Sequence, residues 1–591
     1  MFMSGVPAMY QLKLLGPTPK SDYGRMISFT VVAGFWGLGF AVPLRKLFIL
    51  RQARQLSLIF PLGTASAVTI RALHMSGDGV DRARANVRAI SASFGACFIW
   101  SVATSYAPGI LYTWNVFWWI YKWGGESIMS AVSWGWLSWQ WSPSMLGIGM
   151  LIDLNASLSY FFGTILAWGI IGPSLVAAGA AKGVSYNPDY PDLITYNAFV
   201  PGEYRTTPSP RYWILWPAVF MMLAVSLTTI LLETQHFGRL VKYGVLQLND
   251  RFHRRPQDVG ADRPDRKMSH GDIVDPVAPA HQVRWWEWTS VTVASLVFAL
   301  VAMKYLFGIP PAMNLLNLAL GFMWSIVVIQ VFGAAGTSPI TTVAKGSQFI
   351  TGGILRTEKN TRGYESVARI NLAGAVLSSA AAQQAGELCQ DFRTGFLLGT
   401  PARAQWHAQM IGTTVAVFLS PAIFMLFSDA FPCLLDASAT TCQFALPAVT
   451  AWRVVTEALF MDTFPISQSS WIFSIILSLL GIASVFAKRW LNKHPTLSHW
   501  QIWVPNMSLV GLSMTIPGSA ITMTVAIGSV GSFLWKKYAF ESHEKYMYAT
   551  AAGAIAGEGV GYVVRSILEI VKVAGPTYYG TTLGCVGDVA C

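Results

Sequence analysis

The segment Gly147–Pro173 reads GIGMLIDLNASLSYFFGTILAWGIIGP and has the length and apolar character of a membrane-spanning helix. It also contains Asp153, Asn155, Ser157 and Thr164, together with several glycines and a closing proline. Polar groups in hydrocarbon need partners, and glycine and proline interrupt the hydrogen-bond ladder of a helix. The segment therefore predicts an interrupted helix that lines a polar cavity, an arrangement typical of secondary transporters.

Apolar runs recur along the whole chain of 591 residues, of which 53% are hydrophobic and only 12% are charged. Soluble proteins carry about 25% charged residues. Continuous runs of this kind predict an all-α polytopic membrane protein and argue against a transmembrane barrel, whose strands alternate. The other clear runs are Ile27–Phe40, Ile90–Ala107, Tyr212–Leu232, Val291–Phe307, Ala312–Phe332, Met410–Phe427, Trp471–Phe486, Val504–Trp535 and Tyr546–Val571.

The formal net charge of +12 arises largely from basic residues beside apolar runs. This is the pattern of the positive-inside bias, so the charge predicts cytoplasmic loops and no nucleic-acid partner. A binding site for anionic lipid is the alternative. The clearest such loop contains Arg45, Lys46, Arg51, Arg54, Arg71, Arg82, Arg84 and Arg88 against Asp78 and Asp81.

A hydrophilic segment at residues 233–284 contains RFHRRPQDVGADRPDRKMSHGD and divides the chain. We expect a cytoplasmic linker between a first membrane half, 1–232, and a second, 285–591. The halves share a weak similarity, because Asn155 and Ser157 precede a proline as Asn506 and Ser508 do. Repeats with matching interrupted helices point to a transport site. No GxxxxGK[ST] motif is present, which disfavours an ATP-driven pump.

If the basic loop from Arg45 to Arg88 and the hydrophilic segment 233–284 are both cytoplasmic, an even number of membrane crossings must lie between them. Only three strong apolar runs lie there. The Trp-rich stretch Trp114–Trp141 must supply the fourth crossing, or another segment must re-enter the membrane. Indole rings favour the membrane interface, so we interpret the stretch as an interfacial anchor. Stacking on a substrate is the alternative.

A second polar interruption, GAAGTSPITTVAKGSQF, spans Gly333–Phe349. Gly336, Ser338 and Pro339 could open a helix there, and the restarting helix would direct its positive N-terminus at a carboxylate. Lys345 would add a positive charge. A re-entrant loop that fixes helix packing is the alternative.

A third polar stretch, Gly386–Thr413, starts in a helix, turns polar and returns to an apolar run. Gln405, His407 and Gln409 could line a polar path, although a lone histidine is more often structural than a metal ligand. No zinc-ligand spacing and no Ser–His–Asp or Cys–His arrangement is readable, so we predict neither a metal site nor an enzyme.

Acidic residues within or beside membrane helices are costly and indicate function. Glu558 lies among small residues in AIAGEGVGYVVRS, where burial would disfavour the charged carboxylate and suit proton uptake and release. A structural ion pair, for example with Arg565, is the alternative. For Asp153 the alternative is a hydrogen-bonded helix break. The full set of acidic candidates is Asp153, Glu387, Asp391, Glu457, Asp462 and Glu558.

Five pieces of the chain, in this order, also resemble a known family over nearly its whole length. They are AVPLRKLFIL, FPLGTASAV (Phe60–Val68) followed by His74, the segment Gly147–Pro173, QDFRTGFLLGTPARAQWHAQMIGT and GAIAGEGVGY. The chain resembles the oligopeptide transporter superfamily, and within it the yellow-stripe-like and bacterial branch. The resemblance implies two homologous helical halves with discontinuous helices around a central site. It further implies proton-coupled import of small peptides or of metal complexes with amino-acid-derived chelators, by alternating access.

The resemblance also points to positions that match the family's motifs, and we infer their individual roles from position. The predicted proton-coupling residues are Glu558 and Asp391, which match these motifs, and Asp153, which is predicted from its place within an apolar segment. The predicted substrate-binding residues are Asn155, Ser157, Trp168, Gly336, Ser338, Arg393 and Thr394, and Gly163 belongs to the same motif. The expected partners are the bilayer and a small peptide or metal chelate, with the proton gradient as driving force and no cofactor. We expect the plasma membrane as location, and the chain could form a homo-oligomer.

Two features depart from the family pattern. Only a short, partly polar lead precedes AVPLRK, which suggests a shortened member, and a KIPPR-type motif of the peptide-transporting branch is absent near Gly399–Arg403. The alternative function is therefore a truncated, non-transporting relative that acts as a receptor or assembly subunit. Separately, Cys433 and Cys442 flank a short polar stretch, where a disulfide and two free thiols are both compatible with the sequence.

Overall fold

Long helices dominate the computed structural model, and seven of those described are long and apolar enough to cross a membrane. The predicted all-α polytopic membrane fold is therefore confirmed. These spans are Tyr23–Leu50, Leu154–Ala177, Pro210–Thr229, Trp285–Phe307, Pro311–Gly333, Ala402–Ala430 and Gln468–Leu491. The structure describes residues 1–51, 58–74, 80–187, 190–198, 200, 207–225, 227–229, 231–232, 277–335, 338, 340–437, 447–461, 466–494, 496–574 and 579–588.

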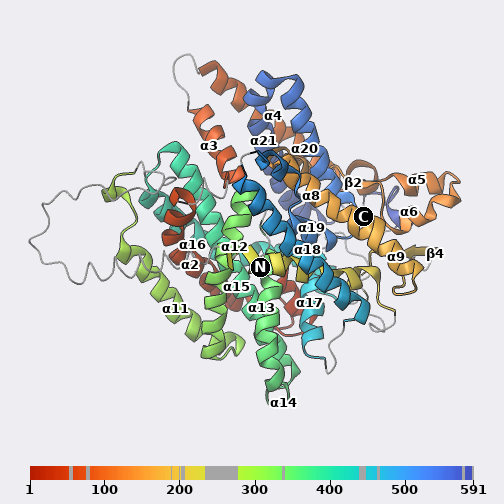
Figure 1. Cartoon of the computed structure of the whole chain (residues 1–591), viewed down its shortest axis with the longest axis horizontal. Helices are drawn as coiled ribbons and strands as arrows, with labels where there is room; N and C mark the ends of the chain where they lie inside the picture. Colours follow the sequence, from red (N-terminus) through yellow and green to blue (C-terminus); the bar gives the residue numbers. More distant parts are fainter. Residues whose placement is uncertain are drawn as a thin grey trace, which may run out of the picture.

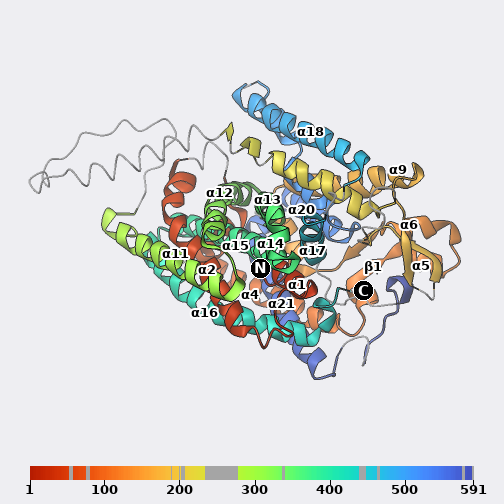
Figure 2. The same ribbon diagram turned by 90° about the horizontal axis from the view of Figure 1, so that it is seen from below.

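One group of helices surrounds α15 (Tyr364–Leu398), which is buried along most of its length because small and apolar residues occupy it on all sides. Its neighbours are α2 (Tyr23–Arg45), α12 (Pro311–Ala335), α13 (Ile340–Leu355), α16 (Ala402–Ala430) and α17 (Pro447–Leu459). Helix α11 (Trp285–Phe307) packs on α2 from outside (Figures 1 and 2).

A second group is built around α21 (Phe540–Ile570) and α20 (Ala520–Tyr538). It includes α4 (Val80–Ala103), α7 (Pro143–Leu151), α8 (Leu154–Thr164) and α19 (Met507–Met514). Helix α3 (Pro61–Leu73) contacts α15 as well as α4 and α21, and so connects the two groups (Figure 1). Helix α18 (Gln468–Lys493) lies beside α19.

The predicted interruption in Gly147–Pro173 is confirmed. Helix α7 ends at Leu151, α8 begins at Leu154, and the chain then continues through a π-helical turn, Ile165–Ile171, into α9 (Gly172–Ala177). The apolar run Val504–Trp535 is likewise divided, into α19 and α20. The polar stretch after Gly386 instead remains helical as far as Leu398, because the first left-handed residue is Gly399, two positions before Pro401.

The Trp-rich stretch forms no spanning helix, so the fourth crossing expected from it is not supplied there. It folds as β1 (Thr113–Asn115), α5 (Val116–Lys122), α6 (Met129–Ser133) and β2 (Ser138–Gln140), with β1 and β2 antiparallel. The Trp114 ring packs against Trp119, Trp139 and Trp141 at centroid distances of 5.2–5.5 Å. With the hairpin of β3 (Val184–Asn187) and β4 (Tyr190–Thr195), this segment forms one end of the molecule (Figures 1 and 2).

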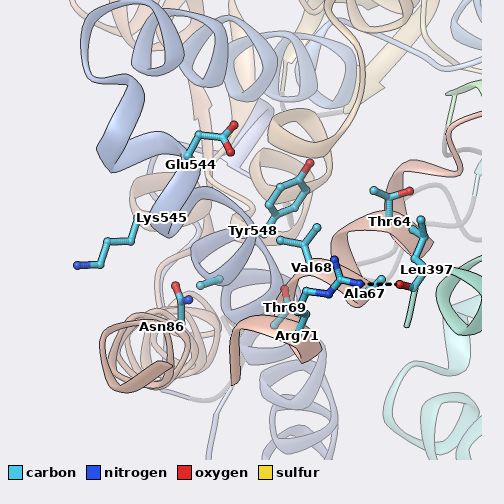
Figure 3. Close-up of a pocket in the computed structure, with 11 residues that line it drawn as sticks. Thr64, Ala67, Val68, Thr69, Arg71, Asn86, Leu397, Glu544, Lys545 and Tyr548 are labelled. Carbon is cyan, nitrogen blue, oxygen red and sulfur yellow. Dashed lines mark hydrogen bonds between the residues drawn. The ribbon is translucent and has the colours of Figure 1, made fainter. Parts of the chain in front are cut away.

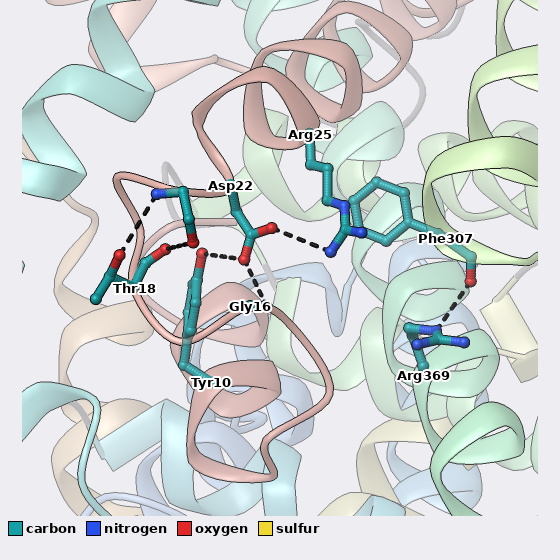
Figure 4. A network of polar contacts seen from close by, with 8 residues as sticks. Tyr10, Gly16, Thr18, Asp22, Arg25, Phe307 and Arg369 are labelled. Carbon is teal, nitrogen blue, oxygen red and sulfur yellow. Dashed lines mark hydrogen bonds and ion pairs between the residues drawn. The ribbon is translucent and has the colours of Figure 1, made fainter.

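The short N-terminal lead folds into the core of the first group. Helix α1 (Gly5–Gln11) packs so closely on α15 and α17 that a Cβ atom at Gly5 would overlap Val376. Asp22, which is 4% exposed, accepts hydrogen bonds from Tyr10 Oη at 3.2 Å and the Gly16 amide at 2.6 Å (Figure 4). It also pairs with Arg25, so one carboxylate closes the loop that leads into α2.

Candidate functional site

Glu558 lies in the middle of α21 and is 1% exposed. Its Oε2 accepts hydrogen bonds from Ser142 Oγ at 2.7 Å and from the Ser144 amide at 2.6 Å. Its Oε1 accepts one from Tyr112 Oη at 3.4 Å. Ser142 is the N-cap of α7, so the carboxylate lies at the positive end of that helix. Three segments of the chain therefore meet at one acidic group.

No basic side chain in the described part of the chain forms an ion pair with Glu558. The nearby Arg565 instead stacks its guanidinium on the Tyr562 ring, 5.1 Å from the centroid. Tyr562 Oη lies 2.6 Å from Tyr112 Oη, which extends the hydrogen-bonded chain beyond the carboxylate. The structural pair with Arg565 that the sequence left open is therefore not formed, and the partners of Glu558 are hydroxyl and amide groups.

Asn155 and Ser157 lie at the start of α8, where it meets the equivalent start of α19. The backbone amide of Asn506 donates to Ser159 Oγ at 3.0 Å, and the side-chain Nδ2 of Asn155 donates to the Val504 carbonyl at 3.4 Å. Ser157, 1% exposed, donates to the Val525 carbonyl at 3.3 Å. The two segments that looked alike in the sequence are therefore in direct contact.

The contact continues along α8 towards Trp168. A Cβ atom at Gly163 would overlap Ser513 and the Val510 carbonyl, which explains why glycine fits this position. The indole of Trp168 is fully buried and donates to the Ile516 carbonyl at 2.8 Å. This carbonyl lies in the break between α19 and α20. The hydrogen bond from Trp168 therefore connects the π-helical turn after α8 to that break.

Asp153 is exposed and caps α8, because its Oδ2 accepts from the Asn155 amide at 3.1 Å. This geometry is the hydrogen-bonded helix break that the sequence analysis left open as the alternative to proton carrying. No observation tests the coupling role itself, which stays a prediction.

Asp391 lies one helical turn after Glu387, on the same face of α15. Both side chains are half-buried. In the described residues neither carboxylate has a basic partner; Glu387 accepts from Gln383 Nε2 at 2.6 Å. Arg393 points elsewhere, with its guanidinium 5.5 Å from the Phe396 ring centroid. Asp391 and Arg393 thus have separate surroundings, as their spacing predicts.

Thr394 connects α15 to α3 by donating to the Gly63 carbonyl at 2.9 Å. Next to it, Phe60 adopts a left-handed backbone conformation, φ 51°, and its amide donates to the Gly333 carbonyl at 2.8 Å. Arg45 stacks on Phe392 at 5.7 Å. Three separated sequence motifs therefore meet at the C-terminal end of α15.

Lys345 on α13 is 0% exposed, and its Nζ has no hydrogen-bond partner in the described structure. The hydroxyl of Ser338, just before α13, is also buried and has no partner among the residues that the structure describes. Beside them, Trp324 and Ser378 both donate to Ser347, at 3.0 and 2.7 Å, so the surroundings are otherwise satisfied. Gly336 lies outside the described residues.

His407 is not aligned with Gln405 on a polar path but approaches Glu287, with Nε2 3.6 Å from Oε1. Glu287, 5% exposed, accepts from Arg403 Nε at 2.9 Å, which ties the first turn of α11 to that of α16. Among the described residues, no group of three or more histidine, cysteine or acidic side chains could hold a metal ion.

The sequence matches the family model described as OPT oligopeptide transporter protein over residues 1–568. The chain belongs to the OPT oligopeptide transporter family. It is 23% identical to the putative oligopeptide transporter YGL114W of Saccharomyces cerevisiae, over 93% of this chain and 81% of that protein.

Two plant relatives place this OPT chain near the yellow-stripe-like branch, as the motifs predicted. It is 24% identical to the iron-phytosiderophore transporter yellow stripe 1 of Zea mays, over 95% of this chain and 75% of that protein. It is also 24% identical to the probable metal-nicotianamine transporter YSL8 of Oryza sativa, over 94% of this chain and 75% of that protein. Membership of a transporter family and the apolar helices make this an integral, multi-pass membrane protein.

The OPT motifs converge in two places. The segments around Glu558 and Asn155 meet between α7, α8, α19 and α21, whereas those around Phe60 and Asp391 meet at the end of α15. The sequence missed Tyr112, Ser142 and Ser144, the donors to Glu558. Ser142 followed by Pro143 is a helix-start signal that could have identified the N-terminus of α7, but nothing local indicates its acidic partner.

Proposed function

We propose that this protein is a proton-coupled secondary transporter that imports small peptides or peptide-like metal chelates by alternating access. Family membership supports solute transport, and the plant relatives named for metal-nicotianamine and iron-phytosiderophore transport support a chelate as one substrate class. We place it in the plasma membrane, driven by the proton gradient, without a bound cofactor and without enzymatic activity.

The observation that carries the proton-coupling proposal is the environment of Glu558. An ionised carboxylate there is held by charge-assisted hydrogen bonds from Ser142, the Ser144 amide and Tyr112. Protonation would remove the charge, and with it the attraction for the N-terminus of α7. Binding and release of one proton would thus change how strongly α21 is held to α7, which is a route from a proton to helix movement. Asp391 is the second candidate.

Uptake into proteoliposomes under an inward proton gradient tests this proposal, with a tripeptide mixture and iron–chelator complexes offered separately. Wild-type protein should accumulate one of the two classes, and Glu558→Gln should abolish gradient-driven accumulation while leaving solute exchange at equal pH intact. Glu541→Gln, an exposed residue of the same helix, is the matched control. Normal gradient-driven uptake by Glu558→Gln would overturn the assignment. Binding without any movement of solute would indicate a receptor or assembly subunit instead.

A further inference from the structure

A cavity of about 390 Å³ lies between α3, α4, the end of α15 and the first turns of α21 (Figure 3). It is separate from the Glu558 cluster: Tyr548, which lines it, precedes Glu558 by ten residues, or about 15 Å along the helix. Its α3 and α15 walls belong to the motifs that meet at Thr394. The cavity therefore lies between the two places where the family motifs converge.

Side chains of opposite charge line this cavity. Arg71 projects from α3 and Glu544 from α21, with Tyr548 between them (Figure 3). Neither charge forms an ion pair within the described structure. Arg71 donates one hydrogen bond, to the Leu397 carbonyl at 3.0 Å, which leaves other guanidinium donors available. Lys545 also lines the cavity, but its ammonium group lies over the Tyr546 ring, 5.1 Å from the centroid.

Two polar groups in the wall are buried and lack partners. Asn86 on α4 is 4% exposed, and within the described part of the chain neither its Oδ1 nor Thr69 Oγ1 on α3 has a hydrogen-bond partner. Buried polar atoms are nearly always paired, so these two atoms have unused hydrogen-bonding capacity in the wall of the cavity. The carbonyl oxygen of Asn86 specifically requires a donor. Ala67, Val68, Leu397 and Ala549 contribute apolar wall, and Thr64 completes the lining.

We propose that this cavity binds a small zwitterionic solute of the amino-acid or peptide type. Its carboxylate would lie at Arg71, and its ammonium group would donate to Glu544 and Asn86. The volume is within the range of small-molecule sites. The inference rests on the proposed function, since the bound solute would be the one transported, and adds a second subsite on its path. An aminophospholipid headgroup carries the same pair of charges, and the experiment separates the two sources.

Protection of an introduced thiol reports on this cavity alone. Val68 lines it and is 39% exposed, so the Val68→Cys variant, in a Cys97→Ala background, should react with a maleimide. Triglycine at twice its dissociation constant should slow this reaction about threefold. Acetylated triglycine amide, which lacks both charges, should not. Labelling of Val87→Cys, an exposed position on α4 outside the cavity, should not change.

Charge variants in the same background test the recognition. Arg71→Gln and Glu544→Gln should each raise the triglycine concentration for half-protection about tenfold, as expected for the loss of a charged hydrogen bond. Arg84→Gln and Glu541→Gln, exposed residues on α4 and α21, should leave it unchanged. Equal protection in all variants would overturn the proposal.

The lipid arm compares nanodiscs of phosphatidylcholine with discs that also contain phosphatidylethanolamine. Protection that requires phosphatidylethanolamine and is insensitive to triglycine would overturn the solute assignment in favour of a headgroup. This readout needs no proton gradient. If wild-type protein transports but triglycine does not protect, only the cavity proposal fails; if triglycine protects in a charge-dependent way and nothing is transported, only the transport proposal fails.

Discussion

At the residue scale, three acidic side chains that look alike in the sequence have different surroundings in the fold. Asp153 is exposed and satisfied by the amide two residues away. Asp391 is half-buried beside another acid. Glu558 is buried and held by donors from two other segments. Because the cost of an ionised carboxylate depends on burial and on its donors, Glu558 is the position where a gained proton changes most contacts.

Lys345 provides a prediction at the same scale. Lys345 is fully buried and its Nζ has no hydrogen-bond partner within the described structure, which destabilises the protein. Lys345→Met should therefore raise the thermal midpoint, with a gain in the free energy of unfolding on the order of a few kcal/mol. The same change should weaken uptake of solutes with a free carboxylate if Lys345 serves as their counter-charge. Melting followed by size-exclusion chromatography measures the first effect.

Lys304→Met is the control for this change, because Lys304 is exposed at the end of α11 and lies near the Tyr305 ring. Its midpoint should shift little. A lower midpoint for Lys345→Met would show that the lysine stabilises the fold, and the interpretation of an unpaired charge would be wrong.

At the scale of elements, α4 and α21 approach closely through Gly553, Gly557 and Gly561, which repeat every four residues. At Gly557 a Cβ atom would overlap the Phe94 carbonyl oxygen. We expect Gly557→Ala to destabilise the protein by about 1–3 kcal/mol, because backbone must move. On the same helix, a Cβ atom added at Gly559 would meet no other atom within 4 Å. Gly559→Ala should therefore be neutral or slightly stabilising, and equal thermal midpoints for the two variants would refute the close packing.

The ion pair between α11 and α16 gives a second prediction for elements. Arg403→Ala leaves Glu287 buried without its partner and should cost about 3–5 kcal/mol. The double variant Glu287→Ala/Arg403→Ala should recover most of the lost free energy of unfolding, because no buried charge of this pair remains. A double-mutant cycle from thermal melts measures the coupling. Additive losses would mean that the two side chains act independently.

At the scale of the whole molecule, the same ion pair and the predicted cytoplasmic linker together predict an orientation in the membrane. It places the start of α11, which follows the predicted cytoplasmic linker, beside the start of α16. Helix α16 is 29 residues long and long enough to cross, so Cys433 just beyond it lies on the opposite side. Cys433 is disulfide-bonded, as expected on an oxidising face, whereas Cys442 lies outside the described residues.

This orientation predicts the outcome of labelling in intact cells. A membrane-impermeant maleimide should modify Cys433 only after an impermeant reductant has been added. Protease should cleave the 233–284 segment only in inverted vesicles. Cleavage of that segment from outside intact cells would contradict the predicted orientation.

The sequence by itself determined what is local: the apolar helices, the interruptions at Ile152–Asp153 and before α13, and the motifs that identify the OPT family. These follow from hydropathy, from glycine and proline, and from residue order. Only the tertiary structure decided which polar residues meet. Tyr112 and Ser142 lie 446 and 416 positions from Glu558, and burial depends on such distant packing. For the same reason the sequence could not show that Asp153 is an exposed helix cap, that Lys345 has no hydrogen-bond partner among the described residues, or that His407 contacts Glu287.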